Sequence, residues 1–168
     1  MYKEFGVDNY YLNNDSYKNP HYNYIEKIVQ YIIDNNIVDL SKCLDMSCGS
    51  GEITKILINN NIKNINATDP YLCDLYNQKY NFKCMNYSFK DIVNNKLKIN
   101  YSTIFCSYAL HLADKSMISN ISWNLSLISK YLVIITPNNK PNINLGWDKI
   151  LEFKYKKSKC RIYKSVNK

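Results

Sequence analysis

Residues 43–54 read CLDMSCGSGEIT, and this stretch carries the residue types of a ligand-binding turn. A short apolar run that contains Asp45 ends at Met46, and Gly49 and Gly51 follow one residue apart. Glycine permits a positive φ and lets a ligand approach the backbone closely. In open α/β sheets, ligands bind beyond the carboxyl ends of the strands. We therefore predict that residues 47–51 form a ligand-facing turn after a first strand.

A second candidate is Asp69, which ends the segment INATD and lies 18 residues after Gly51. A carboxylate at the end of a second strand can accept both hydroxyls of a ribose. Hydrogen bonds to a charged acceptor contribute roughly 1.5–3 kcal/mol. The alternative for Asp69 is a helix N-cap. Thr54 occupies the third glycine position of GxGxxG and no GK[ST] follows, so the pattern predicts a ribose-containing ligand other than NAD and no P-loop.

The only two histidines are candidates for acid–base chemistry. His111 follows the fourth predicted strand, where a reacting substrate would lie, and an ordinary pKa of about 6.5 suits a general base. A histidine that caps or fills the start of the next helix is the alternative. His21 lies in YKNPH, ahead of the first predicted helix.

Cys106 is expected to lie against the core and not to act as a nucleophile.

Alternating strands and helices must position these residues. Apolar residues at helical spacing predict a first helix from His21 to about Asp34. The sequence ILEFKYKKSKCRIYKS predicts an antiparallel hairpin around a basic turn at 156–159, after a loop at 137–147. The other expected strands are 43–46, 65–68, 82–85, 102–108 and 131–136, and the helices between them are 51–61, 71–79, 88–94 and 114–129.

This order of elements predicts an α/β fold, in which a mostly parallel seven-stranded sheet is flanked by helices on both faces. The length of 168 residues is that of one domain. We expect residues 1–21 to form an N-terminal lid segment and 22–168 to form the core.

Composition limits the classes of function. No apolar run approaches about 18 residues, so no membrane-spanning helix is expected, and the N-terminus lacks the apolar region of a signal peptide. A cytoplasmic location follows as an expectation. The six cysteines form no CxxC pair, which favours free buried thiols and no metal site. The net charge of +8 fits an acidic partner such as RNA, or only solubility.

Several of these segments resemble class I S-adenosylmethionine-dependent methyltransferases. LDMSCGSGE is similar to their motif I, TDPY to the acid of motif II, CSYALHL to the motif IV region, and the C-terminal hairpin to their sixth and seventh strands. The resemblance covers residues 22–165. The segments YKNPH, YSFKDI, CSYALHL and VIITPNNKP also resemble a group of small, functionally uncharacterised methyltransferases in that superfamily. The resemblance implies a Rossmann-like fold and S-adenosylmethionine as the cofactor.

The resemblance also implies a set of cofactor-binding residues. The amino-acid part of the cofactor would lie against Asp45 and the turn that contains Ser47, Cys48, Gly49 and Gly51. Asp69 would hold the ribose. The adenine would contact Pro70, Met85 and Ser88, and the sulfonium would lie over Cys106 and Ser107. Tyr17 and His21 would close over the site from the N-terminal segment, with His111 and His21 as the candidate catalytic residues.

The acceptor is less constrained, because methyl transfer requires little beyond in-line positioning and the loss of a proton. Enzymes that methylate exocyclic amines of bases carry an Asp/Asn-Pro-Pro-aromatic run after strand four, where this chain has Cys106-Ser107-Tyr108-Ala109. Ribose 2′-O methylation usually employs a Lys-Asp-Lys-Glu set, and no acid stands at the end of strand four to supply its Asp. Three interpretations stay open: a small-molecule methyltransferase, an RNA or mRNA-cap methyltransferase, and a catalytically inactive binding module.

The basic hairpin bears on the RNA interpretation. Basic residues interleaved with aromatic ones are typical of a nucleic-acid surface, and they also protect an edge hairpin from pairing with other sheets. Substrate recognition is expected to come from the N-terminal segment and the loops at 108–116 and 137–147. The basic residues of the hairpin are Lys154, Lys156, Lys157, Lys159, Arg161 and Lys164.

Overall fold

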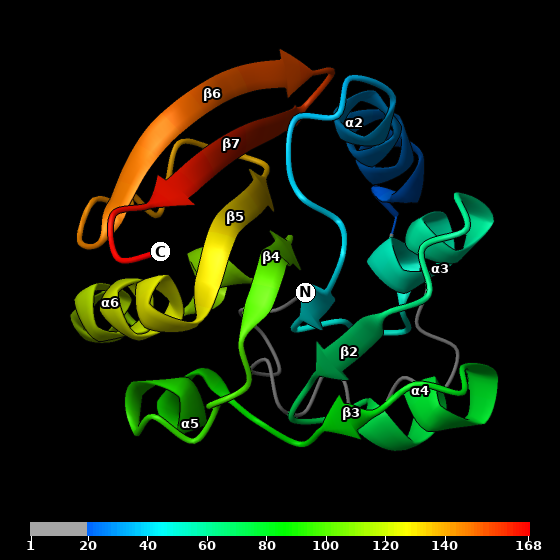
Figure 1. Ribbon diagram of the computed structural model, residues 1–168, viewed down its shortest axis with the longest axis horizontal. Helices are drawn as coiled ribbons and strands as arrows, with labels where there is room; N and C mark the ends of the chain where they lie inside the picture. The colour runs from blue at the N-terminus through cyan, green and yellow to red at the C-terminus, as the bar shows by residue number, and fades with distance from the viewer. Residues whose placement is uncertain (1–19) are drawn as a thin grey trace.

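The computed structural model describes residues 20–168 of the chain. These residues build one seven-stranded sheet with the strand order β3-β2-β1-β4-β5-β7-β6 (Figure 1). The first five strands pair in parallel, while β7 is antiparallel to both β5 and β6. The strands are β1 (Cys43–Met46), β2 (Ile65–Thr68), β3 (Cys84–Met85), β4 (Tyr101–Ser107), β5 (Ser129–Thr136), β6 (Trp147–Tyr155) and β7 (Ser158–Ser165).

Helices cover both faces of the sheet, which confirms the predicted fold class. Alternate residues of β4 point to opposite faces: Phe105 packs in the core with α2 and α3, whereas Ile104 packs with α5 and α6. In Figure 1, α2, α3 and α4 accordingly lie on the side of the sheet opposite to α5 and α6. The helices are α2 (Tyr22–Asp34), α3 (Glu52–Asn59), α4 (Cys73–Lys79), α5 (Phe89–Val93) and α6 (Ile118–Ile128), with short 3-10 turns η1 (Leu110–Leu112) and η2 (Lys115–Met117).

The parallel register brings the carboxyl ends of four strands to one edge. Met46 at the end of β1 is paired with Thr68 on one side and with Cys106 on the other, and Thr68 is paired with Met85. The segments that follow these strands therefore lie next to one another. They are residues 47–51, Asp69, the segment before α5, and Ser107.

Three boundaries differ from the sequence-based prediction. The third strand has only two residues and not the four expected at 82–85. The helix predicted at 114–129 is divided into η2 and α6, and Ser129 already begins β5. The loop predicted at 137–147 ends one residue earlier, because Trp147 already begins β6. The buried indole of Trp147 donates a hydrogen bond of 2.8 Å to the carbonyl of Ser122, which fixes the start of this strand.

The prediction of free thiols is wrong for two of the six cysteines. Cys73, the first residue of α4, forms a disulfide with Cys84 of β3, because α4 and β3 lie side by side at this edge of the sheet. The other four cysteines are free and buried, as predicted. Among residues 20–168, no helix combines the length and the hydropathy needed to cross a bilayer.

Candidate active site

The glycine turn (residues 47–51) connects β1 to α3 and contains three residues with a positive φ. The φ angles are 55° at Ser47, 57° at Gly49 and 94° at Gly51. The positive φ at Gly51 is as predicted, and the packing around it adds a second reason for glycine. A Cβ atom there would lie 2.4 Å from the ring of Tyr80 and 3.2 Å from that of Tyr76. Helix packing, and not only ligand approach, therefore requires Gly51.

Asp45 holds the turn against α3. Its Oδ2 accepts hydrogen bonds from the backbone N–H of Thr54 at 3.0 Å and from the Thr54 hydroxyl at 2.7 Å. The Thr54 hydroxyl also lies 2.9 Å from that of Tyr76. The Asp45 side chain is 1% exposed, and burial raises its pKa to about 8 despite these hydrogen bonds. Asp45 thus lies beneath the turn and fixes the strand to the helix.

Asp69 connects the end of β2 to the glycine turn. Its Oδ2 accepts the backbone N–H of Gly49 at 3.0 Å, while Oδ1 accepts those of Tyr71 and Leu72 at 2.8 and 2.9 Å. A carboxylate offers about four acceptor positions, so one position on Oδ2 is left for a ligand. Burial raises the pKa of Asp69, and the three N–H donors oppose that rise. The residue therefore fixes two backbone segments and retains capacity to bind a hydroxyl.

The residues predicted to contact an adenine differ in accessibility. Pro70 is half-buried beside Asp69, whereas the side chain of Met85 is packed in the core. Ser88 caps α5 in a reciprocal pair: its Oγ accepts the N–H of Asp91, and the Asp91 carboxylate accepts the N–H of Ser88. The thiol of Cys48 is buried, 3.9 Å from the sulfur of Cys84.

Cys106 and Ser107 end β4, where the resemblance places the reacting group. The Cys106 side chain is 1% exposed in the apolar core, as predicted, and burial raises the pKa of its thiol to about 12. A thiol with that pKa is protonated at neutral pH and is a poor nucleophile. Ser107 is half-buried at the edge of the sheet. Of these two residues, only Ser107 is partly exposed at the end of β4.

Tyr108 brings the two histidines of the chain together. The rings of His21 and Tyr108 are stacked with centroids 4.2 Å apart and an interplanar angle of 15°, and His111 meets the Tyr108 ring edge-on at 6.3 Å. Tyr108 has a left-handed backbone (φ 51°), which is uncommon for a bulky residue and is often found at functional sites. Its hydroxyl is hydrogen-bonded to that of Ser158. We call His21, Tyr108 and His111 the histidine cluster.

The environment of the histidine cluster favours neutral imidazoles. Burial lowers the pKa of His111, and the nearby His21 lowers it further. Burial and the charge of Lys157 lower the pKa of His21. Among residues 20–168, no group forms a hydrogen bond with the buried Nδ1 of His111. A neutral imidazole with an unused nitrogen has the properties of a general base.

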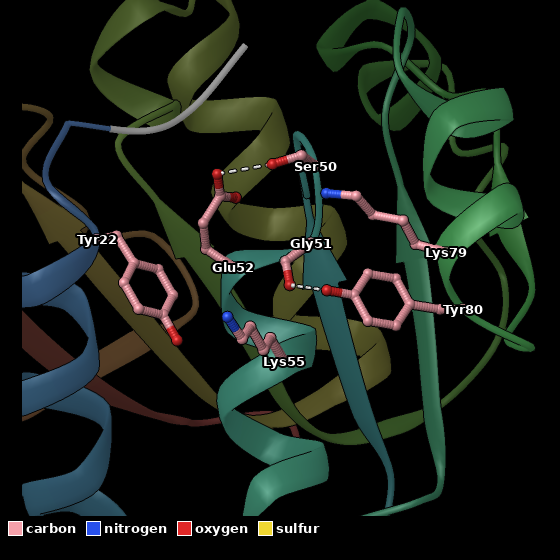
Figure 2. Close-up of a pocket in the computed structure, with 7 residues that line it drawn as sticks. All are labelled: Tyr22, Ser50, Gly51, Glu52, Lys55, Lys79 and Tyr80. Carbon is pink, nitrogen blue, oxygen red and sulfur yellow. Dashed lines mark hydrogen bonds between the residues drawn. The ribbon is translucent and has the colours of Figure 1, made fainter. Parts of the chain in front are cut away.

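A pocket of about 360 Å³ adjoins the outer side of the glycine turn (Figure 2). Its walls come from the start of α2, the start of α3 and the end of α4, and Asp69 does not line it. Tyr80 closes one side by donating a hydrogen bond of 3.2 Å to the carbonyl of Gly51. The lining residues are Tyr22, Ser50, Gly51, Glu52, Lys55, Lys79 and Tyr80.

Some expectations lie outside the described residues, and some site residues were not predicted. Tyr17 and the rest of the lid segment before Pro20 are outside residues 20–168. Tyr108 was not proposed as a site residue, although it directly follows β4. Ser158 had no sequence signal, because it meets Tyr108 only through the pairing of β7 with β5.

The basic hairpin is less uniformly exposed than its sequence suggests. Arg161 is 3% exposed, and its guanidinium donates hydrogen bonds of 2.6 Å to the carbonyls of Asn139 and Pro141. Arg161 therefore orders the loop after β5 and does not belong to a nucleic-acid surface. Lys159 and Lys149 both form ion pairs with Glu152, at 2.8 and 2.6 Å.

Comparison with known proteins gives one related sequence and many related folds. No family model matches the chain. An uncharacterised protein of Schizosaccharomyces pombe, C17A5.05c, is 26% identical over an alignment 143 positions long, and the match covers 62% of this chain. The chain spans 58% of the length of that relative.

Solved structures with the same fold include several methyltransferases. The magnesium protoporphyrin IX methyltransferase ChlM of Synechocystis PCC 6803, solved with bound S-adenosylmethionine, has a TM-score of 0.67 and 13% identity over 99% of this chain and 93% of its own. TehB of Haemophilus influenzae has a TM-score of 0.62 and 13% identity over 94% and 66%. The 16S rRNA methylase RmtB has a TM-score of 0.63 and 11% identity over 86% and 64%. The fold is therefore the Rossmann-like fold of S-adenosylmethionine-dependent methyltransferases.

Proposed function

We propose that the protein is an S-adenosylmethionine-dependent methyltransferase that acts on a small molecule. The observation that carries the proposal is the convergence, at one edge of the sheet, of the glycine turn, Asp69 and the histidine cluster. A nucleoside-binding turn and a candidate general base follow neighbouring strands, β1 and β4. This is the arrangement that methyl transfer between a nucleoside cofactor and a second substrate requires.

The residues at this edge fit the cofactor. Oδ2 of Asp69 retains one acceptor position for a ribose hydroxyl, and Pro70 offers an apolar surface to the adenine. The backbone of the glycine turn and Ser107 would face the amino-acid part and the sulfonium. Asp45, Cys48, Met85 and Ser88 would support these segments from beneath, because their side chains are buried or engaged in the cap of α5.

The protein's own part in the reaction is to orient the acceptor and remove its proton. When bound, S-adenosylmethionine supplies an electrophilic methyl group, whose transfer forms the bond to the acceptor and leaves the C–S electron pair on the departing S-adenosylhomocysteine. The imidazole of His111 would take the proton that the acceptor loses. His21 and Tyr108 would hold the acceptor beside it.

Direct binding measurements test this function. Calorimetric titration with S-adenosylmethionine and S-adenosylhomocysteine should give micromolar dissociation constants, and NAD should not bind. If the protein binds neither S-adenosylmethionine nor S-adenosylhomocysteine, the proposal is refuted. If both bind but no acceptor is methylated in a broad screen, the protein is a binding module with the same fold.

A further inference from the structure

The turn between β6 and β7 lies against the histidine cluster. Ser158, the first residue of β7, is hydrogen-bonded through its hydroxyl to that of Tyr108 at 2.5 Å. On the other side of the turn, the ring of Tyr155 meets that of Tyr24 edge-on at 6.4 Å, and Tyr24 lies 6.4 Å from His21. Lys156 and Lys157, which we call the lysine turn, are therefore held between two contacts beside the cluster.

The lysine turn carries two exposed positive charges. Lys156 and Lys157 are exposed, and within residues 20–168 neither forms an ion pair. The charge reaches the cluster, because Lys157 contributes to the lowered pKa of His21. Lys149 and Lys159 differ, since Glu152 pairs with both.

We propose that the methyl acceptor carries a carboxylate or a phosphate, which the lysine turn binds beside the histidine cluster. This inference rests on the proposed function. The ammonium groups of the lysine turn would bind the negative charge of the acceptor, and His111 would take its proton. Recognition and chemistry would therefore use different residues. A neutral histidine cluster needs such an external cation to hold an anion, because two neutral imidazoles supply no charge.

The distribution of charge favours a small anion over RNA. Binding of a nucleic acid uses a stripe of several phosphate contacts. On this hairpin the stripe is interrupted, because Arg161 is buried and Lys159 is paired with Glu152. The exposed lysines that remain near the turn are few and compact, which suits one anionic group. Ammonium groups bind carboxylate and phosphate alike as point charges.

The experiment compares benzoate with benzamide, a neutral molecule of similar shape. Both are titrated into the full chain labelled at histidine, with and without S-adenosylhomocysteine, and the imidazole NMR signals of His21 and His111 report binding. We expect benzoate to bind at least about tenfold more tightly than benzamide, which corresponds to about 1.4 kcal/mol. The double variant K156Q/K157Q should lose this preference. The control K63Q changes an exposed lysine ahead of β2, at the opposite end of the strands, and should retain it.

Each outcome decides the inference. Equal binding of benzoate and benzamide, or a preference that persists in K156Q/K157Q, would overturn it. Inorganic phosphate is titrated in the same way as a second arm. Tighter binding of phosphate than of benzoate assigns a phosphorylated acceptor, and tighter binding of benzoate assigns a carboxylate. Tight binding of a single-stranded RNA oligonucleotide that weakens steeply with salt would replace the small anion by RNA. Failure of S-adenosylhomocysteine to bind refutes the proposed function separately, because the anion preference is also measured without it.

Discussion

The carboxylate of Asp69 accepts the backbone N–H of Gly49 at 3.0 Å, and this bond joins the end of β2 to the glycine turn that follows β1. The same carboxylate accepts two N–H groups of its own chain segment. One side chain thus fixes the segment that follows β1 and the segment that follows β2. The N-cap of α4 is Leu72, so Asp69 is not the helix N-cap that the sequence left as the alternative, and its binding of a ribose stays a prediction.

Replacement of Asp69 by asparagine should test the predicted binding of a ribose hydroxyl. The asparagine side chain keeps one acceptor oxygen and loses the negative charge. Its NH₂ group would face backbone N–H groups, which are also donors, in place of the second carboxylate oxygen. We expect the affinity for S-adenosylhomocysteine to fall by about 10- to 150-fold, which corresponds to the roughly 1.5–3 kcal/mol of a charged hydrogen bond. Calorimetry measures this loss. The control is D74N, which changes an exposed carboxylate in α4.

Adenosine and 2′-deoxyadenosine provide a finer readout for the same variant. If Asp69 accepts a ribose hydroxyl, the wild-type protein prefers adenosine, and D69N loses that preference. A preference that survives in D69N would show that Asp69 acts on the turn alone.

Gly51 is predicted to be required for packing. G51A should lower the free energy of unfolding by roughly 1–3 kcal/mol, because its Cβ would overlap the Tyr80 ring at a backbone with φ 94°. Urea unfolding measures the loss. In the background Y80A the overlap is gone, so the same substitution should cost less, leaving mainly the backbone strain. Equal costs in the two backgrounds would contradict the packing explanation.

Asp45 should make the stability depend on pH. Burial raises its folded-state pKa from 3.8 to about 8, so the folded state binds the proton more tightly than the unfolded state. This contribution to stability is complete below the unfolded pKa and is lost as the pH rises through about 8. D45N cannot ionise and can still accept hydrogen bonds from Thr54. We expect the wild type to lose stability relative to D45N between about pH 4 and pH 8 in urea unfolding. Parallel curves would contradict the assignment.

The disulfide between Cys73 and Cys84 should contribute to stability under oxidising conditions. It closes a loop with a sequence separation of 11 residues, for which loop entropy gives about 2–3 kcal/mol. Dithiothreitol should lower the urea midpoint of the wild type by a corresponding amount. The double variant C73S/C84S should show the lower midpoint with and without dithiothreitol. A wild-type midpoint that does not respond to reductant would contradict this contribution.

Local signals made much of the fold predictable, and the unpredicted contacts are long-range. β1 and β2 begin and end where their apolar runs predicted, and Asp69 was found because it directly follows one of these runs. The cap formed by Ser88 was not predicted, although Asp91 three residues later is a local signal for it. In contrast, Tyr108 meets His21 and Ser158 across separations of 87 and 50 residues. Only the assembled sheet brings such residues together.

The histidine cluster makes the last prediction. The chain has only two histidines, so NMR titration gives two sets of imidazole signals, which the variant H21Q assigns. Both pKa values should lie below the ordinary 6.5, because burial disfavours the charged imidazoles. In H21Q the pKa of His111 should rise toward 6.5, since a neighbouring positive charge is removed.

The same coupling should appear in catalysis. Because the base must be neutral, methyl transfer should decline as the pH falls through the pKa of His111, and H21Q should move that decline to higher pH. H111Q should lower kcat by about 10²- to 10⁴-fold, abolish the decline and leave the affinity for S-adenosylhomocysteine unchanged. Retention of the wild-type pH profile in H111Q would show that another group takes the proton. His111 would then fill the start of η1 as a structural residue, which is the alternative that the sequence left open.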